Sequence, residues 1–189
     1  MKLISLSGPC GSGKTTLIEI LKPNYDFVNS IYKNSDGAQL DPTLYISKMD
    51  YVKKWFDEVC VHHNNGKFLI VSDRSPFDSL AYLKVGQSKF KQLLNNNFSK
   101  LKHLGIDHYP ILITAEKEIL RRRIQERHVS GTSSVIEYEQ ELNLLEKSLL
   151  FFEETTRINT LIIDTSNETP LESYLKLRNY VNQISKSIT

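Results

Sequence analysis

Short apolar runs alternate with longer amphipathic segments along the chain. Four of these runs, at residues 2–6, 68–71, 111–113 and 161–163, are mostly apolar, which is typical of strands buried on both faces of a parallel sheet. A further strand is expected near residues 27–32. Because strands that alternate with helices are the mark of βαβ units, the pattern predicts a three-layer α/β fold with a five-stranded parallel sheet.

Helical periodicity fills the segments between the expected strands. In the second helix, apolar side chains recur at intervals of three or four residues, from Tyr45 through Val52 to Val59, and define a buried stripe. The last helix opens with a capping box between Thr169 and Glu172 and has a proline at its first position. The expected helices cover residues 14–21, 44–60, 76–84, 89–103, 115–127, about 135–152, and a last segment from 169 onward.

A glycine-rich run follows the first expected strand and opens the first expected helix. Gly8, Gly13, Lys14 and Thr15 match the pattern G-x-x-x-x-G-K-[ST], which binds phosphate when it joins a strand to a helix. Glycines let the backbone approach a ligand, amides and the helix N-terminus attract phosphate, the lysine contacts the β- and γ-phosphates, and the threonine coordinates Mg²⁺. The sequence therefore predicts a site for ATP and Mg²⁺. The residues expected to bind ATP are Gly8, Pro9, Cys10, Gly11, Ser12, Gly13, Lys14, Thr15 and Thr16.

An aspartate and an arginine, Asp73 and Arg74, follow the third expected strand. If that strand neighbours the first, both residues lie at the same edge of the sheet as the glycine-rich loop, because ligands bind beyond the carboxyl ends of parallel strands. Asp73 can hold Mg²⁺ through water or orient the acceptor, and Arg74 can grip a phosphate or a carboxylate with two hydrogen bonds. We expect Lys14, Asp73 and Arg74 to be catalytic, and Thr15 and Asp73 to be the metal ligands.

Four arginines crowd the helix that precedes a polar segment at residues 128–134. Arg123 and Arg127 are four residues apart and so share a face. Mobile arginines can stabilise the charge of a transferred phosphoryl group, and a closing segment can exclude water. The alternative is a solvated face on which the arginines pair with Glu116, Glu118 and Glu126. We expect a helical lid over about residues 121–137, with Arg123 and Arg127 in catalytic roles.

Composition narrows the class of protein. The 189 residues are 40% hydrophobic and 24% charged, with a net charge of +2, which fits one domain over residues 1–189 and argues against a dedicated nucleic-acid binder. Two cysteines provide no disulfide framework, so a reducing, cytoplasmic location is expected. No apolar run is long enough to span a membrane, and no signal peptide is recognisable.

At this point the chain resembles the thymidylate kinase and deoxynucleoside kinase branch of P-loop kinases. The resemblance rests on three blocks, at residues 8–15, 73–82 and 123–127, whose order and spacing match the family over nearly the whole chain. It implies a P-loop NTPase fold, ATP as donor, Mg²⁺, and a small-molecule acceptor that is a nucleoside or a nucleoside monophosphate. It also implies that Asp73 serves the metal or the acceptor, Arg74 the acceptor or its phosphate, and Arg123 and Arg127 the donor phosphates.

Two positions near the acceptor depart from the family's pattern. Deoxynucleoside kinases usually carry Glu-Arg-Ser, and thymidylate kinases place an aromatic residue or His after the arginine, whereas this chain has Asp-Arg-Ser. The family's acidic residue after the second strand has two candidate counterparts, Asp36 and Asp41. The identity of the general base therefore stays open between them.

The acceptor pocket has several aromatic candidates. Tyr51 and Trp55 lie one helical turn apart beside the buried stripe, so they either line the pocket or form the edge of the core. Tyr82 has the same two alternatives. The acceptor-binding residues expected from these arguments are Asp36, Tyr51, Trp55, Arg74 and Tyr82.

Three functions are carried forward. The first is a kinase for nucleosides or nucleotides, and a homodimer is compatible with it. The second is a kinase that phosphorylates a hydroxyl on nucleic acid, for which the lysine-rich stretch at residues 84–102 is the one hint. The third is a non-catalytic nucleotide switch, which the lack of the guanine motif Asn-Lys-x-Asp disfavours.

Overall fold

The computed structural model describes residues 1–28, 45–81, 83, 86–131, 142, 145, 148–152 and 160–186, and only the backbone of residues 27, 28 and 45–48. Five strands form one sheet in the order β2-β3-β1-β4-β5, and every pair of neighbours is parallel. The strands are β1 (Lys2–Ser7), β2 (Asp26–Val28), β3 (Leu69–Asp73), β4 (Asp107–Thr114) and β5 (Leu161–Asp164). The predicted five-stranded parallel sheet is therefore confirmed.

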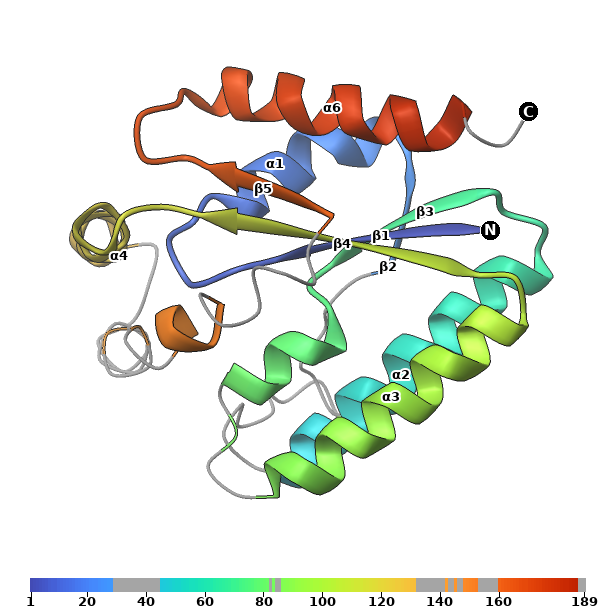
Figure 1. Cartoon of the computed structure of the whole chain (residues 1–189). Helices are drawn as coiled ribbons and strands as arrows, with labels where there is room; N and C mark the ends of the chain where they lie inside the picture. Colours follow the sequence, from blue (N-terminus) through green and yellow to red (C-terminus); the bar gives the residue numbers. More distant parts are fainter. Residues whose placement is uncertain are drawn as a thin grey trace.

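Helices cover both faces of the sheet (Figure 1). One face carries α1 (Lys14–Leu21) and α6 (Pro170–Lys186), and the other carries α2 (Tyr45–Asn64) and α3 (Gln87–His103). A further helix, α4 (Lys117–Val129), lies near the carboxyl ends of the strands, at the left of Figure 1. Because the helices cover the two faces of the sheet, a ligand site is expected at the edge formed by the carboxyl ends of the strands.

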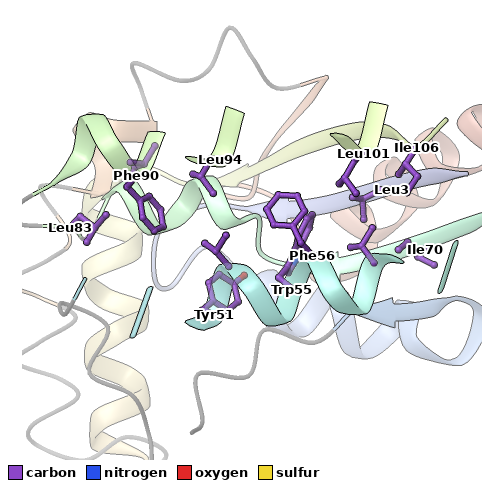
Figure 2. Packing of buried hydrophobic residues seen from close by; sticks show 13 residues of the cluster. Leu3, Tyr51, Trp55, Phe56, Ile70, Leu83, Phe90, Leu94, Leu101 and Ile106 are labelled. Atoms are coloured by element: carbon purple, nitrogen blue, oxygen red, sulfur yellow. The ribbon is translucent and has the colours of Figure 1, made fainter. Parts of the chain in front are cut away.

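The core between the sheet and the α2–α3 pair is rich in aromatic side chains (Figure 2). Tyr51, Trp55 and Phe56 of α2 pack with Phe90 and Leu94 of α3 and with the central strands. Burial of side chains this large contributes roughly 1.5–3 kcal/mol each to stability. The other face is aliphatic, with leucines and isoleucines of β1, α1 and α6 in contact. Each central strand is therefore buried on both faces, which explains its apolar sequence.

Several element boundaries differ from the sequence-based expectation. The segment expected to be helical over residues 76–84 forms a 3₁₀-helix over Pro76–Ala81. Strand β4 begins at Asp107, because pairing of Lys2 with Asp107 extends it through residues that carry no apolar signal. Helix α2 continues to Asn64. Strand β2 covers Asp26–Val28, so it includes the first two residues of the strand expected at residues 27–32. Residues 29–32 lie outside the described residues.

The start of α6 matches its sequence signature. The hydroxyl of Thr169 accepts a hydrogen bond from the Glu172 amide at 3.3 Å, and the Glu172 carboxylate accepts one from the Thr169 amide at 2.7 Å. The predicted capping box is confirmed.

Among the residues that the structure describes, no helix combines the length and hydrophobicity needed to cross a lipid bilayer.

Candidate functional site

The glycine-rich loop links the end of β1 to the start of α1. Its glycines take positive φ angles, of 143° at Gly8 and 92° at Gly13, which other residues rarely adopt. A Cβ at Gly8 would lie 2.0 Å from the carbonyl oxygen of Ile113 in β4. Glycine is therefore required there for the loop to lie against the neighbouring strand.

Lys14 turns its side chain back over this loop. Its ammonium donates to the carbonyl oxygens of Gly8 at 2.8 Å and Pro9 at 2.7 Å, and to the hydroxyl of Ser12 at 3.1 Å. Only 5% of the residue is exposed. Burial first, and then the positive charge of Arg74, lower the pKa of Lys14 from 10.5 to about 8. A buried cation of this kind favours an anionic ligand.

Strand β3 brings Asp73 and Arg74 to the same edge. Asp73 pairs in register with Leu6 of β1, and the Arg74 amide donates to the Leu6 carbonyl at 3.1 Å. The expected adjacency of strand β3 and β1 is thus confirmed. Both side chains act electrostatically on Lys14, Arg74 lowering its pKa and Asp73 raising it. The pairing of β1 and β3 therefore brings Asp73, Arg74 and the glycine-rich loop to the same edge of the sheet.

A cleft of about 520 Å³ opens over the glycine-rich loop. Its walls include Arg74, Arg123, Arg127 and Thr165, and its floor is the loop itself. We call it the donor cleft, defined by residues 10–17, 74, 123, 126, 127, 130, 165, 168, 170 and 173. The size suits a nucleotide, since ligand pockets span roughly 300–1,000 Å³.

The four arginines of α4 divide into two pairs. Arg121 and Arg122 form exposed ion pairs with Glu118 and Glu126 of the same helix, at 3.3 and 3.6 Å. Arg123 and Arg127 line the donor cleft instead, so the structure brings those two to the loop. The described part of the expected lid, residues 121–131, is the end of α4 and a turn, and residues 132–137 lie outside the described residues.

Thr165 is a site residue that the sequence reasoning missed. Its carbonyl and hydroxyl oxygens accept hydrogen bonds from Arg123 at 2.7 and 2.8 Å, and its hydroxyl lies 3.1 Å from the carbonyl oxygen of Ser12. Arg123 also reaches the Gly11 carbonyl at 3.3 Å. The pair thus ties the end of β5 and helix α4 to the glycine-rich loop. No motif marks Thr165, because its partners are distant in sequence.

A second cleft, of about 770 Å³, lies on the α3 side of the sheet and shares no lining residue with the donor cleft. Ser7 and Ser75 line it. Ser7 directly precedes the glycine-rich loop, and Ser75 directly follows Arg74. We call it the aromatic cleft, defined by residues 7, 75, 77, 78, 95, 98, 99, 102, 106–110, 151 and 152. The two clefts together follow the carboxyl edge and one face of the sheet.

Stacked rings form one wall of the aromatic cleft. Phe98 stacks on Phe77 with ring centroids 4.8 Å apart and on His108 with centroids 4.6 Å apart. The His108 Nε2 atom lies 2.7 Å from the Ser5 hydroxyl, and burial lowers the pKa of His108 to about 3. The imidazole is therefore neutral near pH 7 and behaves as a flat aromatic surface.

The aromatic residues expected in the acceptor pocket lie elsewhere. Tyr51 and Trp55 are 2% and 1% exposed, belong to the α2–α3 core, and line neither cleft. The acceptor-binding role expected for these two side chains is corrected to a place in the core, because α2 turns their face toward α3. Asp36, Asp41 and Tyr82 lie outside the described residues.

Asp78 is the second residue that the sequence reasoning passed over as a site residue. It is 2% exposed, lines the aromatic cleft, and raises the pKa of Lys14 through its charge. The 3₁₀-helix places it there, since its amide donates to the Ser75 carbonyl at 2.9 Å. A carboxylate between a lysine and a cleft is a candidate acid or base.

Across the described ranges, no group of three or more His, Cys, Asp or Glu side chains is placed to hold a metal ion. Magnesium in nucleotide sites commonly uses one or two protein oxygens together with substrate phosphates. Thr15 lines the donor cleft. Asp73 lines neither cleft, although its charge raises the pKa of Lys14, so a magnesium site shared by Thr15 and Asp73 stays a prediction.

Comparisons with known proteins bear on the fold. No protein-family model and no curated protein matches the chain. A solved structure of deoxyadenosine kinase from M. mycoides with bound dATP is similar, at 17% identity and a TM-score of 0.60, over 96% of this chain and 100% of that chain. Shikimate kinase from Acinetobacter baumannii in complex with shikimate is similar at 17% identity and a TM-score of 0.57, over 96% and 93% of the two chains. The chain therefore has the fold of P-loop kinases.

Proposed function

We propose that this protein is an ATP-dependent kinase that transfers the γ-phosphoryl group of ATP to a nucleoside or a nucleoside monophosphate. The observation that carries the proposal is the convergence of Lys14, Arg74, Arg123 and Arg127 on one loop-floored cleft. Phosphoryl transfer needs positive charge around the transferred group and exact positioning rather than a covalent intermediate. This cleft supplies charge from three different elements.

The donor cleft holds ATP in this proposal. Loop amides and Lys14 bind the β- and γ-phosphates, and Lys14 releases one of its loop contacts as phosphate oxygens arrive. Thr15 and Asp73 hold Mg²⁺, which shields the phosphate charge when bound. Arg123 keeps the loop in shape through Thr165, and Arg127 faces the same phosphates. The dATP bound by the M. mycoides enzyme supports an adenine nucleotide.

The aromatic cleft holds the acceptor. Ser75, which lines it, follows Arg74 of the donor cleft in the chain, and its wall of stacked rings suits a planar base better than a saturated polyol. Asn95 and Lys102 add polar contacts at its rim. Arg74 contacts the acceptor from the donor cleft, and Asp78, which lines the aromatic cleft, takes the proton of the attacking hydroxyl.

The test is direct transfer of label. The protein is incubated with γ-labelled ATP and Mg²⁺ and with separate panels of nucleosides, nucleoside monophosphates, shikimate and DNA oligomers. We expect label in a nucleoside or nucleotide product. Label in the oligomers alone would replace the proposal with a nucleic-acid kinase, and label in no acceptor would leave a nucleotide-binding module.

A matched pair of variants ties the label to the loop. Lys14→Ala is expected to lower transfer about 10²- to 10³-fold, because it removes charge at the transferred group. Lys22→Ala removes an exposed lysine whose one ion pair within the described residues is with Glu19, and it is expected to leave transfer unchanged. Equal activity of the two variants would refute the role of Lys14.

A further inference from the structure

We propose that Trp55 and Ser72 are positioning residues for Arg74: a buried hydrogen-bond relay from α2 through β3 fixes the Arg74 backbone and thereby directs its guanidinium into the donor cleft. The kinetic part of this inference rests on the proposed function, whereas the relay itself does not. It gives Trp55, a core residue, a defined effect on the site.

The relay consists of two short hydrogen bonds. The indole Nε1 atom of Trp55 donates to the Ser72 hydroxyl at 2.6 Å, and that hydroxyl donates to the Arg74 carbonyl oxygen at 2.7 Å. Ser72 is fully buried. The bond from Trp55 is buried and the bond to Arg74 is partly buried, so water cannot readily replace the indole as the partner of Ser72.

The direction of the relay is fixed by chemistry. An indole N–H can only donate, so Ser72 must accept from Trp55. A hydroxyl has a single proton, and with its oxygen receiving one hydrogen bond that proton is left for the Arg74 carbonyl. Replacing the indole by a phenyl ring removes this constraint on Ser72 without removing the aromatic ring.

Arg74 needs such support because its backbone is strained. Its φ angle is 75°, and it is the one non-glycine residue with a positive φ in the described part of the chain. A side chain costs about 1–2 kcal/mol in this region. Its amide is held by Leu6 at 3.1 Å, and its carbonyl is held by Ser72. The surroundings therefore impose an unfavourable conformation at a residue that faces the cleft.

Trp55 is a rigid anchor for the relay. It is 1% exposed and makes an edge-to-face contact with Phe56 at 4.9 Å and a tilted contact with Phe98 at 5.8 Å. Figure 2 shows it between α2 and the central strands, among the large side chains of the core. An indole held on several sides presents its N–H at one position.

The kinetic experiment uses Trp55→Phe and Ser72→Ala, each alone and in an Arg74→Ala background. We expect each single change to lower kcat about tenfold, the scale of one buried hydrogen bond, with the KM for ATP within about twofold. In the Arg74→Ala background we expect no further loss. Equal losses in both backgrounds, or no loss in the wild-type background, would overturn the relay.

Two controls separate the relay from general damage to the core. Phe90→Leu lies in the same core and should lower stability without the selective effect on kcat. If Trp55→Phe fails to fold, Ser72→Ala alone carries the test, because it deletes one oxygen. A Phe90→Leu variant with the same kcat loss would also overturn the proposal.

A readout without turnover distinguishes this inference from the proposed function. The Nε–H signal of Arg74 in an NMR spectrum of ¹⁵N-labelled protein can be assigned by its loss in Arg74→Lys. We expect the signal to shift or broaden in Trp55→Phe and Ser72→Ala and to stay in place in Phe90→Leu. An unmoved signal in both relay variants would refute the relay even in an active kinase, whereas absent transfer with a moved signal would refute only the kinase.

Discussion

Lys14 is the buried lysine of the donor cleft, and its surroundings predict that a proton is taken up when an anionic ligand binds. Its ammonium is buried among two carbonyl oxygens and a hydroxyl, and burial lowers its pKa to about 8. Near pH 8 about half of the free protein therefore carries a neutral Lys14. A polyphosphate favours the charged form and raises the pKa.

We therefore expect ATP binding to take up protons near pH 8. The uptake should approach about half a proton per site at pH 8 and fall toward zero at pH 7, where Lys14 is already protonated. Calorimetric titrations in buffers of different ionisation enthalpy measure it. Lys14→Met is the control and should show none. Proton release, or equal uptake in the variant, would contradict the proposed state of Lys14.

Arg74 offers a prediction about stability at the same scale. Its φ of 75° suits glycine and strains any other residue. The free energy of unfolding of Arg74→Gly, measured by urea denaturation, should therefore be about 1 kcal/mol higher than that of Arg74→Ala. Both variants lose the guanidinium and should transfer phosphate poorly. If the alanine variant were as stable as the glycine variant, the backbone at Arg74 would not be strained.

At the scale of elements, the loop and β4 are in contact through Gly8. A Cβ there would meet the backbone carbonyl of Ile113 at 2.0 Å, and a strand backbone cannot move aside as a side chain can. By contrast, Gly66 has a similar need for positive φ, at 72°, but nothing lies within 4 Å of its added Cβ. The two glycines differ in the neighbour that they face and in φ, which is 143° at Gly8 and 72° at Gly66.

Alanine at these two glycines should therefore have unequal effects. We expect Gly66→Ala to lower the free energy of unfolding by about 1 kcal/mol from backbone strain alone. Gly8→Ala should lower it by about 3 kcal/mol or more and should abolish ATP binding, because the loop must leave β4. Urea denaturation and a fluorescent nucleotide titration measure the two effects. Similar losses for both variants would mean that the close approach at Gly8 is not limiting.

At the scale of the whole molecule, the sequence was informative where the cause of structure is local. The strands at the centre of the sheet are apolar because both faces are covered, and the glycine-rich loop is one continuous motif. The start of β4 was not readable, because Lys2 of a distant strand pairs with Asp107 and fixes it. The role of Trp55 stayed open between pocket and core, because the spacing of apolar residues shows which face of a helix is buried but not which residues cover that face.

The same reasoning explains which site residues the sequence revealed. Lys14 and Arg74 stand in or beside recognisable patterns. Thr165 is marked as a site residue by its place in the donor cleft and its hydrogen bonds with Ser12 and Arg123, and the aromatic cleft assembles mainly from α3, β4 and the 3₁₀-helix after β3. Motifs can be recognised from the sequence alone, whereas a cleft formed by distant elements can be recognised only once the topology is known.

The chain links the proposed donor and acceptor regions directly. Arg74 lines the donor cleft, and the next residue, Ser75, lines the aromatic cleft. If both are used in one reaction, a single compound that fills both should gain affinity, because its second half binds at a high effective concentration. A suitable probe is ATP joined through one further phosphate to the 5′-oxygen of a deoxynucleoside.

We expect this conjugate to raise the melting temperature more than saturating ATP does, by the linkage between ligand affinity and stability. Ser99→Trp, which fills the aromatic cleft from α3, should keep the shift with ATP and lose the extra shift with the conjugate. Lys100→Trp adds the same ring next to Ser99 but at a position that does not line the cleft, so it should behave as wild type. Only a ligand that occupies both clefts gains affinity from joining its two halves. The acceptor would therefore lie outside the aromatic cleft if the conjugate raised the melting temperature no more than ATP does, or if its additional effect persisted in Ser99→Trp.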